Sequence, residues 1–414
     1  MNPATWNSDW PGDRHERRRF RPGVSGLEGR RLMSGSAATL TTVASFRGDN
    51  QAIVGGLTMD GQGNIYGTTS AVGGAIEKSN ASVFEIARGS KAATTLVTFD
   101  NARGYGIGKI GADAHGNVYG TTSGLGGANG DGRVFEIASG SHEAKPLADF
   151  NGANGAFPNG VAVDALGNVY GTTAVGGADG VATAFEVARG SNAITPLSVF
   201  PGPGAAPRAP LIDAQGDLFG VNTTGGPKGA ATVYEIPHGT GTVVNLATFG
   251  GLDGAGVGNV AVDSQGNVYG TTEDGGTFGY GSAFEIVKGS NAVTTIASFT
   301  PLTGEGPNPN VGLVVDGQGN LYGTTVEGGT YGNGTIFEIA RGSGHITTLT
   351  SFQNFAGTSV NGLILDGQGN LYGTTDGGGS VAGTVFKLAL TRPIPAPAAI
   401  SSTTAHVPKG PRRR

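Results

Sequence analysis

The sequence predicts an all-β fold, a seven-bladed β-propeller with four antiparallel strands in each blade and the last blade closed by the N-terminal strand. Three observations lead to this prediction. One phrase recurs seven times along the chain, at intervals of 49 to 53 residues. Each interval holds four short runs that are typical of strands. The chain also begins with the one run that its last unit lacks, which favours a ring over a linear stack.

The recurring phrase has the form Asp-x-x-Gly-Asn-x-Tyr-Gly-Thr-Thr and is followed by Gly-Gly. Its aspartates are Asp60, Asp113, Asp164, Asp213, Asp263, Asp316 and Asp366. The glycine three residues after each Asp suits a tight reversal, because glycine adopts positive φ without steric cost. The Asp carboxylate can accept backbone N–H groups within the same turn. We therefore interpret the seven aspartates as structural turn residues; a calcium loop would need further alternating Asp or Asn ligands that are absent.

Four strands, a to d, are expected in each unit; the last unit illustrates strands a to c, and the unit before it illustrates strand d. Strand a is residues 362–365, strand b residues 370–375, strand c residues 384–388 and strand d residues 346–352. β-branched and aromatic residues dominate these runs, and no run in the repeats sustains a 3.6-residue apolar period. Almost no helix is expected.

The order of the strands predicts how the ring closes. Seven strand-d runs end at Phe46, Phe99, Phe150, Phe200, Phe249, Phe299 and Phe352. The first of them, residues 40–46, precedes any strand a, and the last unit stops after strand c near Leu390. A ring would place residues 40–46 beside residues 383–390 and leave no open strand edge. We expect a leader at residues 1–36, the propeller at 37–390 and a Pro-rich basic tail at 391–414.

Composition excludes several classes of function. Cysteine is absent, which excludes disulfides, cysteine-ligated metals and a cysteine nucleophile. The net charge is −5; the first 36 residues carry +3 and the last 24 carry +5, so the middle carries −13. An acidic middle disfavours nucleic acid as a partner, and no apolar run is long enough to span a membrane. The six histidines are dispersed, so we expect no metal site. We also expect no cofactor and a monomer.

The phrase Gly-Asn-Leu-Tyr-Gly-Thr-Thr with its following Gly-Gly resembles the GloVer tandem repeat over residues 37 to 390. That repeat occurs in predicted extracellular proteins of Verrucomicrobia, Gloeobacter and related bacteria. The resemblance implies an extracellular or cell-surface location and no established activity. Residues 26–34, Gly-Leu-Glu-Gly-Arg-Arg-Leu-Met-Ser, also resemble the N-terminal export segment of many planctomycete proteins.

The b–c and d–a loops share one face of a propeller, and there the copies differ most. Aromatic rings beside carboxylates and amides suit a glycan or peptide site. The candidate ligand-binding residues are Tyr105, Phe157, Asn159, Asp274, Phe278, Tyr280, Glu327 and Tyr331. The hypothesis is a non-catalytic propeller that binds a glycan or protein there. The alternatives are a carbohydrate-active or lyase-type propeller enzyme and a structural surface or adhesion component.

The fourth unit departs from the others. Asp217 replaces Asn, Phe219 replaces Tyr, and Val221-Asn222 replaces Thr-Thr. This blade has either drifted or been specialised for a partner.

Overall fold

The computed structural model describes residues 38–46, 51–53, 56–71, 81–99, 105–124, 126–127, 129–177, 180–202, 204–250, 254–300, 309, 311–353, 359–378 and 381–390. The expected leader at 1–36, with the export-like segment at 26–34, and the expected tail at 391–414 lie outside the described residues.

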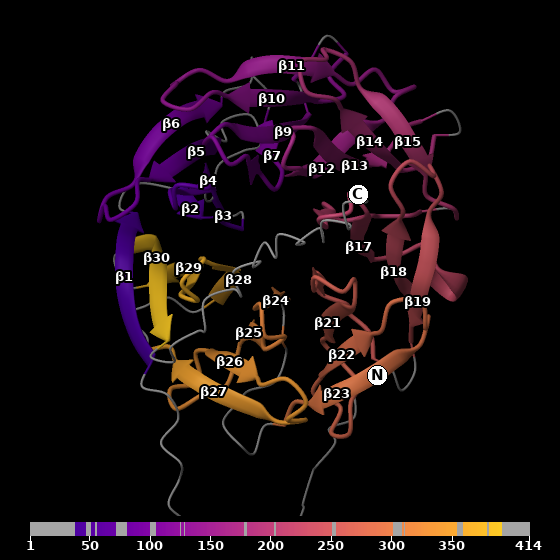
Figure 1. The fold of residues 1–414 in the computed structure, drawn as a ribbon. Coiled ribbons are helices and arrows are strands. Elements are labelled where there is room, and N and C mark those ends of the chain that lie inside the picture. The colour runs from indigo at the N-terminus through magenta and orange to yellow at the C-terminus, as the bar shows by residue number, and fades with distance from the viewer. Residues whose placement is uncertain are drawn as a thin grey trace, which may run out of the picture. The chain divides into compact units, whose positions relative to one another are not determined.

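The described strands form seven antiparallel sheets arranged in a ring, which confirms the predicted seven-bladed propeller (Figure 1). Blade 1 consists of β2 (Gln51–Ile53), β3 (Thr58–Met59), β4 (Ile65–Ala71), β5 (Ala81–Ile86) and β6 (Thr94–Phe99). Blade 2 consists of β7 (Tyr105–Ile107), β8 (Gly111–Ala112), β9 (Val118–Gly124), β10 (Arg133–Ile137) and β11 (Lys145–Asp149). In these two blades strand a is divided into two pieces, which both pair with strand b.

The remaining blades have four strands each. Blade 3 consists of β12 (Ala156–Val163), β13 (Val169–Val175), β14 (Thr183–Val187) and β15 (Thr195–Val199). Blade 4 consists of β16 (Leu211–Ile212), β17 (Leu218–Asn222), β18 (Ala231–Ile236) and β19 (Val244–Phe249). Blade 5 consists of β20 (Ala261–Val262), β21 (Val268–Thr272), β22 (Ser282–Ile286) and β23 (Val293–Ser298). Blade 6 consists of β24 (Val311–Val315), β25 (Leu321–Thr325), β26 (Thr335–Ile339) and β27 (Ile346–Ser351). Among the described residues the helical content is one short 3₁₀ turn, η2 (Pro227–Gly229).

Blade 7 closes the ring with strands from both ends of the repeat region. It consists of β28 (Ser359–Leu365), β29 (Leu371–Gly378), β30 (Val381–Leu390) and β1 (Ala38–Phe46). Strand β1 pairs antiparallel with β30, from Ala38 opposite Leu390 to Phe46 opposite Gly383. The predicted closure is therefore confirmed, and β1 takes the strand-d place on the rim that Figure 1 shows for β27 in the neighbouring blade.

Seven apolar clusters hold neighbouring blades together, one at each junction. At every junction the aromatic ring that ends strand d contacts the strand-c ring of the next blade. The seven pairs are Phe46–Phe84, Phe99–Phe135, Phe150–Phe185, Phe200–Tyr234, Phe249–Phe284, Phe299–Phe337 and Phe352–Phe386. Their ring centroids are 4.6–5.3 Å apart, a separation at which such pairs contribute about 0.5–1.5 kcal/mol beyond area burial.

The strand-b glycine of the repeat makes room for these rings. A Cβ atom on Gly120 would lie 2.5 Å from Cζ of Phe135, and one on each equivalent glycine of the other six blades would lie 2.4–2.6 Å from Cζ of the strand-c ring. Only glycine fits beneath the aromatic ring on the neighbouring strand. The glycine of the Tyr-Gly-Thr-Thr phrase is thus explained by packing between strands b and c.

Candidate functional site

The a–b and c–d turns form one face of the propeller, which we call the turn face. In each blade the Asp carboxylate organises the a–b turn. In blade 1, Oδ1 of Asp60 accepts hydrogen bonds from the backbone N–H groups of Gln62 and Asn64, at 2.9 and 2.8 Å. Its Oδ2 accepts from Asn64 Nδ2 at 2.8 Å and from the Tyr66 hydroxyl at 3.0 Å. The turn glycine, Gly63, has a φ of +86°.

The Asn and the Tyr of the repeated phrase make contacts beyond the a–b turn that the sequence did not predict. Oδ1 of Asn64 accepts the backbone N–H of Arg88 at 2.9 Å, and this joins the a–b turn to the c–d turn of the same blade. The Tyr66 hydroxyl also lies 3.4 Å from Oε1 of Glu85 on strand c. Burial, then the neighbouring Asp60 and Glu85 carboxylates, raise the pKa of the Tyr66 phenol above its ordinary value.

Blade 4 lacks much of this network. Phe219 has no hydroxyl, and Asp217 has no amide hydrogens to donate, so Oδ2 of Asp213 is buried without a hydrogen-bond partner. Oδ2 of Asp217 instead lies 4.0 Å from Nζ of Lys288 in blade 5. Burial and the Asp217 carboxylate raise the pKa of Glu235, while Lys288 opposes the rise.

The b–c and d–a loops form the opposite face, which we call the loop face. Four predicted aromatic residues lie there and are exposed, with 40% to 56% of each residue accessible: Phe157, Phe278, Tyr280 and Tyr331. Phe278 and Tyr280 share the β21–β22 loop of blade 5, and Tyr331 lies in the equivalent loop of blade 6. Phe157 lies at the start of β12 in blade 3, so blade 4 separates it from the other three.

The backbone at Phe157 is unusual. Its φ is +55°, in the left-handed region that bulky side chains rarely adopt. The chain accepts this conformation beside a β-bulge between Pro158 and Gly160. The backbone N–H of Phe157 donates to the carbonyl of Asp131, in the b–c loop of blade 2, at 2.9 Å.

The other predicted candidates on the loop face are three polar residues and one tyrosine whose side chain the structure does not describe. Nδ2 of Asn159 donates to the carbonyl of Pro207 in blade 4 at 2.8 Å. Asp274 and Glu327 are exposed on the b–c loops of blades 5 and 6. Tyr105 begins β7, but its side chain is outside the described residues. These residues come from blades 2, 3, 5 and 6.

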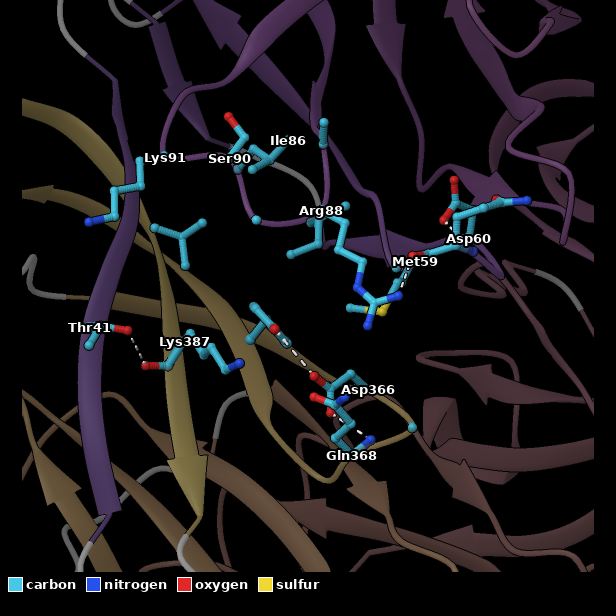
Figure 2. Close-up of a pocket in the computed structure, with 18 of the residues that line it drawn as sticks. Thr41, Met59, Asp60, Ile86, Arg88, Ser90, Lys91, Asp366, Gln368 and Lys387 are labelled. Carbon is cyan, nitrogen blue, oxygen red and sulfur yellow. Dashed lines mark hydrogen bonds between the residues drawn. The ribbon is translucent and has the colours of Figure 1, made fainter.

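A large cavity lies on the turn face, where the ring closes between blades 7 and 1. Its volume is about 740 Å³, within the range of small-molecule sites. Blade 7 contributes Val43, Asp366, Tyr372 and Lys387, and blade 1 contributes the a–b turn with Met59 and Asp60 and the c–d turn from Arg88 to Lys91. Figure 2 shows the Arg88 and Lys387 side chains reaching into the same space, with Asp60 to one side of Arg88 and Asp366 below it. The sequence alone did not indicate this cavity.

Two smaller cavities lie elsewhere. One of about 430 Å³ occupies the matching turn-face position between blades 3 and 4, lined by Tyr170, Glu186 and His238. Another of about 590 Å³ lies on the loop face between η2 and the loop that leads into blade 5.

Within the described ranges, His, Asp and Glu side chains nowhere gather in threes as a metal site would require. In the same part of the chain, no helix has the length and apolar character needed to cross a membrane.

Comparisons with solved structures agree with the fold. The chain is similar to virginiamycin B lyase from Staphylococcus aureus, with 14% identity over 85% of this chain and 99% of that chain and a TM-score of 0.57. It is also similar to oligogalacturonate lyase from Vibrio parahaemolyticus, with 8% identity over 86% and 98% of the two chains and a TM-score of 0.51. At such identities the likeness concerns the fold alone. No curated protein matches the sequence.

A family model supports the repeat that the sequence suggested. The model described as the Gloeobacter/Verrucomicrobia repeat matches residues 54–284 and 257–403. These matches span most of the chain, from blade 1 to beyond blade 7. The chain therefore belongs to the Gloeobacter/Verrucomicrobia repeat family.

Proposed function

We propose that this protein is a non-catalytic binding propeller of the bacterial cell surface or extracellular space, and that its loop face binds a glycan. The observation that carries the proposal is the distribution of exposed aromatic rings. Among the described residues, every large aromatic side chain that is exposed to solvent lies in a b–c loop or a d–a segment: Phe157, Phe278, Tyr280 and Tyr331.

Exposed rings are well suited to sugars. An aromatic face packs against the C–H groups of a pyranose ring, while nearby amides and carboxylates bond its hydroxyl groups. The loops that hold Phe278, Tyr280 and Tyr331 also carry Asp274 and Glu327. Nε2 of Gln353 donates to the Tyr331 hydroxyl at 3.0 Å, which orients that ring.

The strained backbone at Phe157 also supports the proposal. A bulky residue at positive φ costs about 1–2 kcal/mol relative to glycine, and glycine is abundant in these loops. A phenylalanine in this strained position suits a side chain that contacts a ligand.

The location rests on sequence features. The family resemblance implies extracellular proteins, and residues 26–34 resemble an export segment. Cell fractionation with mass spectrometry of the native protein would test export and processing together. Recovery of the uncleaved chain from the cytoplasm would contradict the proposed location.

A glycan array with the purified protein tests the binding. We expect the loop-face variants Tyr280→Ala and Tyr331→Ala each to lower the affinity for a detected glycan about tenfold, since one stacked ring contributes about 1–1.5 kcal/mol. Phe157→Gly should reduce binding without loss of thermal stability, because it removes the ring and the strained φ together.

Leu166→Ala is the matched control. Leu166 is an exposed apolar residue on an a–b turn, on the opposite face, and its loss should leave binding unchanged. Equal binding by the wild type and the loop-face variants, or no glycan bound in the array, would contradict the proposal. Turnover of a bound sugar that disappears in Asp274→Asn or Glu327→Gln would favour an enzyme instead. Self-association without any glycan would favour a structural surface component.

A further inference from the structure

We propose that the cavity between blades 7 and 1 binds a small organic anion, an acidic group on a body of about the size of a sugar ring. This site lies on the turn face, away from the loop face of the proposed function, and does not depend on that function. Three steps lead to it: the charge of the cavity, its difference from the other junctions, and the nature of its walls.

The first step is the identity of the residue opposite the strand-b aromatic. In blades 1 to 6 that cross-strand partner is a glutamate: Glu85, Glu136, Glu186, Glu235, Glu285 and Glu338. In blade 7 the partner of Tyr372 is Lys387. The Lys387 ammonium lies 5.4 Å from the centroid of the Tyr372 ring. A cation thus replaces a carboxylate at this junction.

The second step is the c–d turn of blade 1, which faces Lys387 across the cavity. Arg88 and Lys91 both line the cavity. The residues at the position of Lys91 in the other c–d turns are His142, Asn192, Gly241, Asn291 and Gly344. Two of the three cations are therefore particular to this junction.

The third step is the state of the two carboxylates in the cavity. Asp366 accepts bonds from the backbone N–H groups of Gln368 and Asn370, from Asn370 Nδ2 and from the Tyr372 hydroxyl, at 2.7–3.2 Å. Asp60 accepts the equivalent four bonds in blade 1. Both charges are thus engaged within their own turns.

The cations are not engaged in the same way. Across the described part of the chain, Arg88, Lys91 and Lys387 form no ion pair. The Arg88 guanidinium makes one long bond, 3.5 Å, to the carbonyl of Gln62, and the Lys387 ammonium contacts the Tyr372 ring. The lining thus holds three cations, Arg88, Lys91 and Lys387, against the two carboxylates, and this net positive charge is available to a ligand.

The walls favour an organic anion over a bare inorganic ion. Val43, Met59, Ile65 and Ile86 line the cavity together with Tyr372. Its volume of about 740 Å³ exceeds the roughly 430 Å³ of the matching cavity between blades 3 and 4, where Glu186 takes the place of Lys387. An apolar wall beside several cations suits a carboxylate on a body with C–H surface.

Isothermal titration of the full chain with a matched pair of probes tests the site. The probes are 4-nitrophenyl β-D-glucuronide and 4-nitrophenyl β-D-glucoside, which differ only in the carboxylate. The wild type should bind the glucuronide about tenfold more tightly than the glucoside, a preference that rising salt should weaken. Lys387→Glu should remove this preference and leave the weak binding of the glucoside unchanged.

The variants are chosen to keep the fold. Lys387→Glu and Lys91→Asn each introduce the residue that other blades already hold at that position, and circular dichroism would verify folding. Arg88→Gln should also lower glucuronide affinity, whereas Arg341→Gln, the same c–d turn position in blade 6, should not. Equal affinity for the two probes, no binding of either at millimolar concentration, or unchanged preference in Lys387→Glu would overturn the proposal.

Discussion

A single carboxylate in each blade determines how the turn face is built, and blade 4 reveals what that carboxylate needs. Six aspartates bond two backbone N–H groups, an asparagine amide and a tyrosine hydroxyl, as Asp60 does. Asp213 keeps only its backbone bonds, to Gln215 and Asp217. Its other oxygen is buried and unpartnered, and such an atom costs about 1–3 kcal/mol.

Blade 4 should become more stable when the common residues are restored. We expect the double variant Asp217→Asn, Phe219→Tyr to raise the free energy of unfolding by about 1–2 kcal/mol, because the new amide and hydroxyl supply donors to Asp213. Urea denaturation followed by circular dichroism measures the change. The matched control adds Asp213→Asn, which should abolish the gain; an unchanged or lower midpoint in the double variant would contradict this account.

Strands b and c are joined by more than their backbone ladder. The tyrosine of strand b bonds the Asp of the a–b turn and, in blades 1, 2, 3 and 5, also approaches the glutamate of strand c. Burial is the largest cause of the raised pKa of these phenols, in Tyr66, Tyr119, Tyr170 and Tyr269. Strands b and c therefore lose stabilisation when this tyrosine is deprotonated.

This predicts a loss of stability in alkali. The folded pKa of each tyrosine lies above the ordinary value of about 10, so the folded state binds more protons than the unfolded state once the pH exceeds that value. The stabilisation is complete below about pH 10 and falls above it, by up to about 1.4 kcal/mol per pH unit for each tyrosine.

Denaturant midpoints measured between neutral pH and strong alkali would record how steeply the stability falls with pH. Tyr119→Phe should be less stable at neutral pH, because it loses its bonds to Asp113 and Glu136, and should show a shallower decline above pH 10. If the stability of Tyr119→Phe falls with pH in parallel with that of the wild type, the tyrosines are not the cause of the loss of stability in alkali.

The ring as a whole depends on pairing between β1 and β30. Thr39 lies opposite Ala389 in that pair, and the chain contains no cysteine of its own. The variant Thr39→Cys, Ala389→Cys should form one disulfide on oxidation and gain about 2–4 kcal/mol relative to its reduced form. Thiol titration and thermal unfolding measure both effects.

The control for this cross-link places the second cysteine on another rim strand. Thr39→Cys combined with Thr248→Cys of β19 in blade 4 should form no internal bridge. Bridging in the control, or none in the paired variant, would be incompatible with the observed closure.

The ring and its blades could be predicted from the sequence because the repeat is periodic and each glycine and Asp has one clear local role. The cavity between blades 7 and 1 could not. It combines Lys387 with Arg88, which are distant in sequence, and only the register of β29 with β30 places Lys387 opposite Tyr372. The one signal in the sequence was the break at Lys387 in a column of glutamates. The exposure of the loop aromatics follows from their loop positions, which leave large side chains in solvent; their role in ligand binding stays a prediction.

The pairing of β1 with β30 also sets the order in which the protein can reach its final form. Among the described strands, a ribosome makes β1 first and β30 last. Until residues 381–390 have emerged, β1 lacks its neighbour and the flank of blade 1 that contains Ile53, Leu57 and Ile65 remains uncovered. Over that interval the edge of β1 that pairs with β30 is open to other strands, the arrangement that favours unwanted strand pairing.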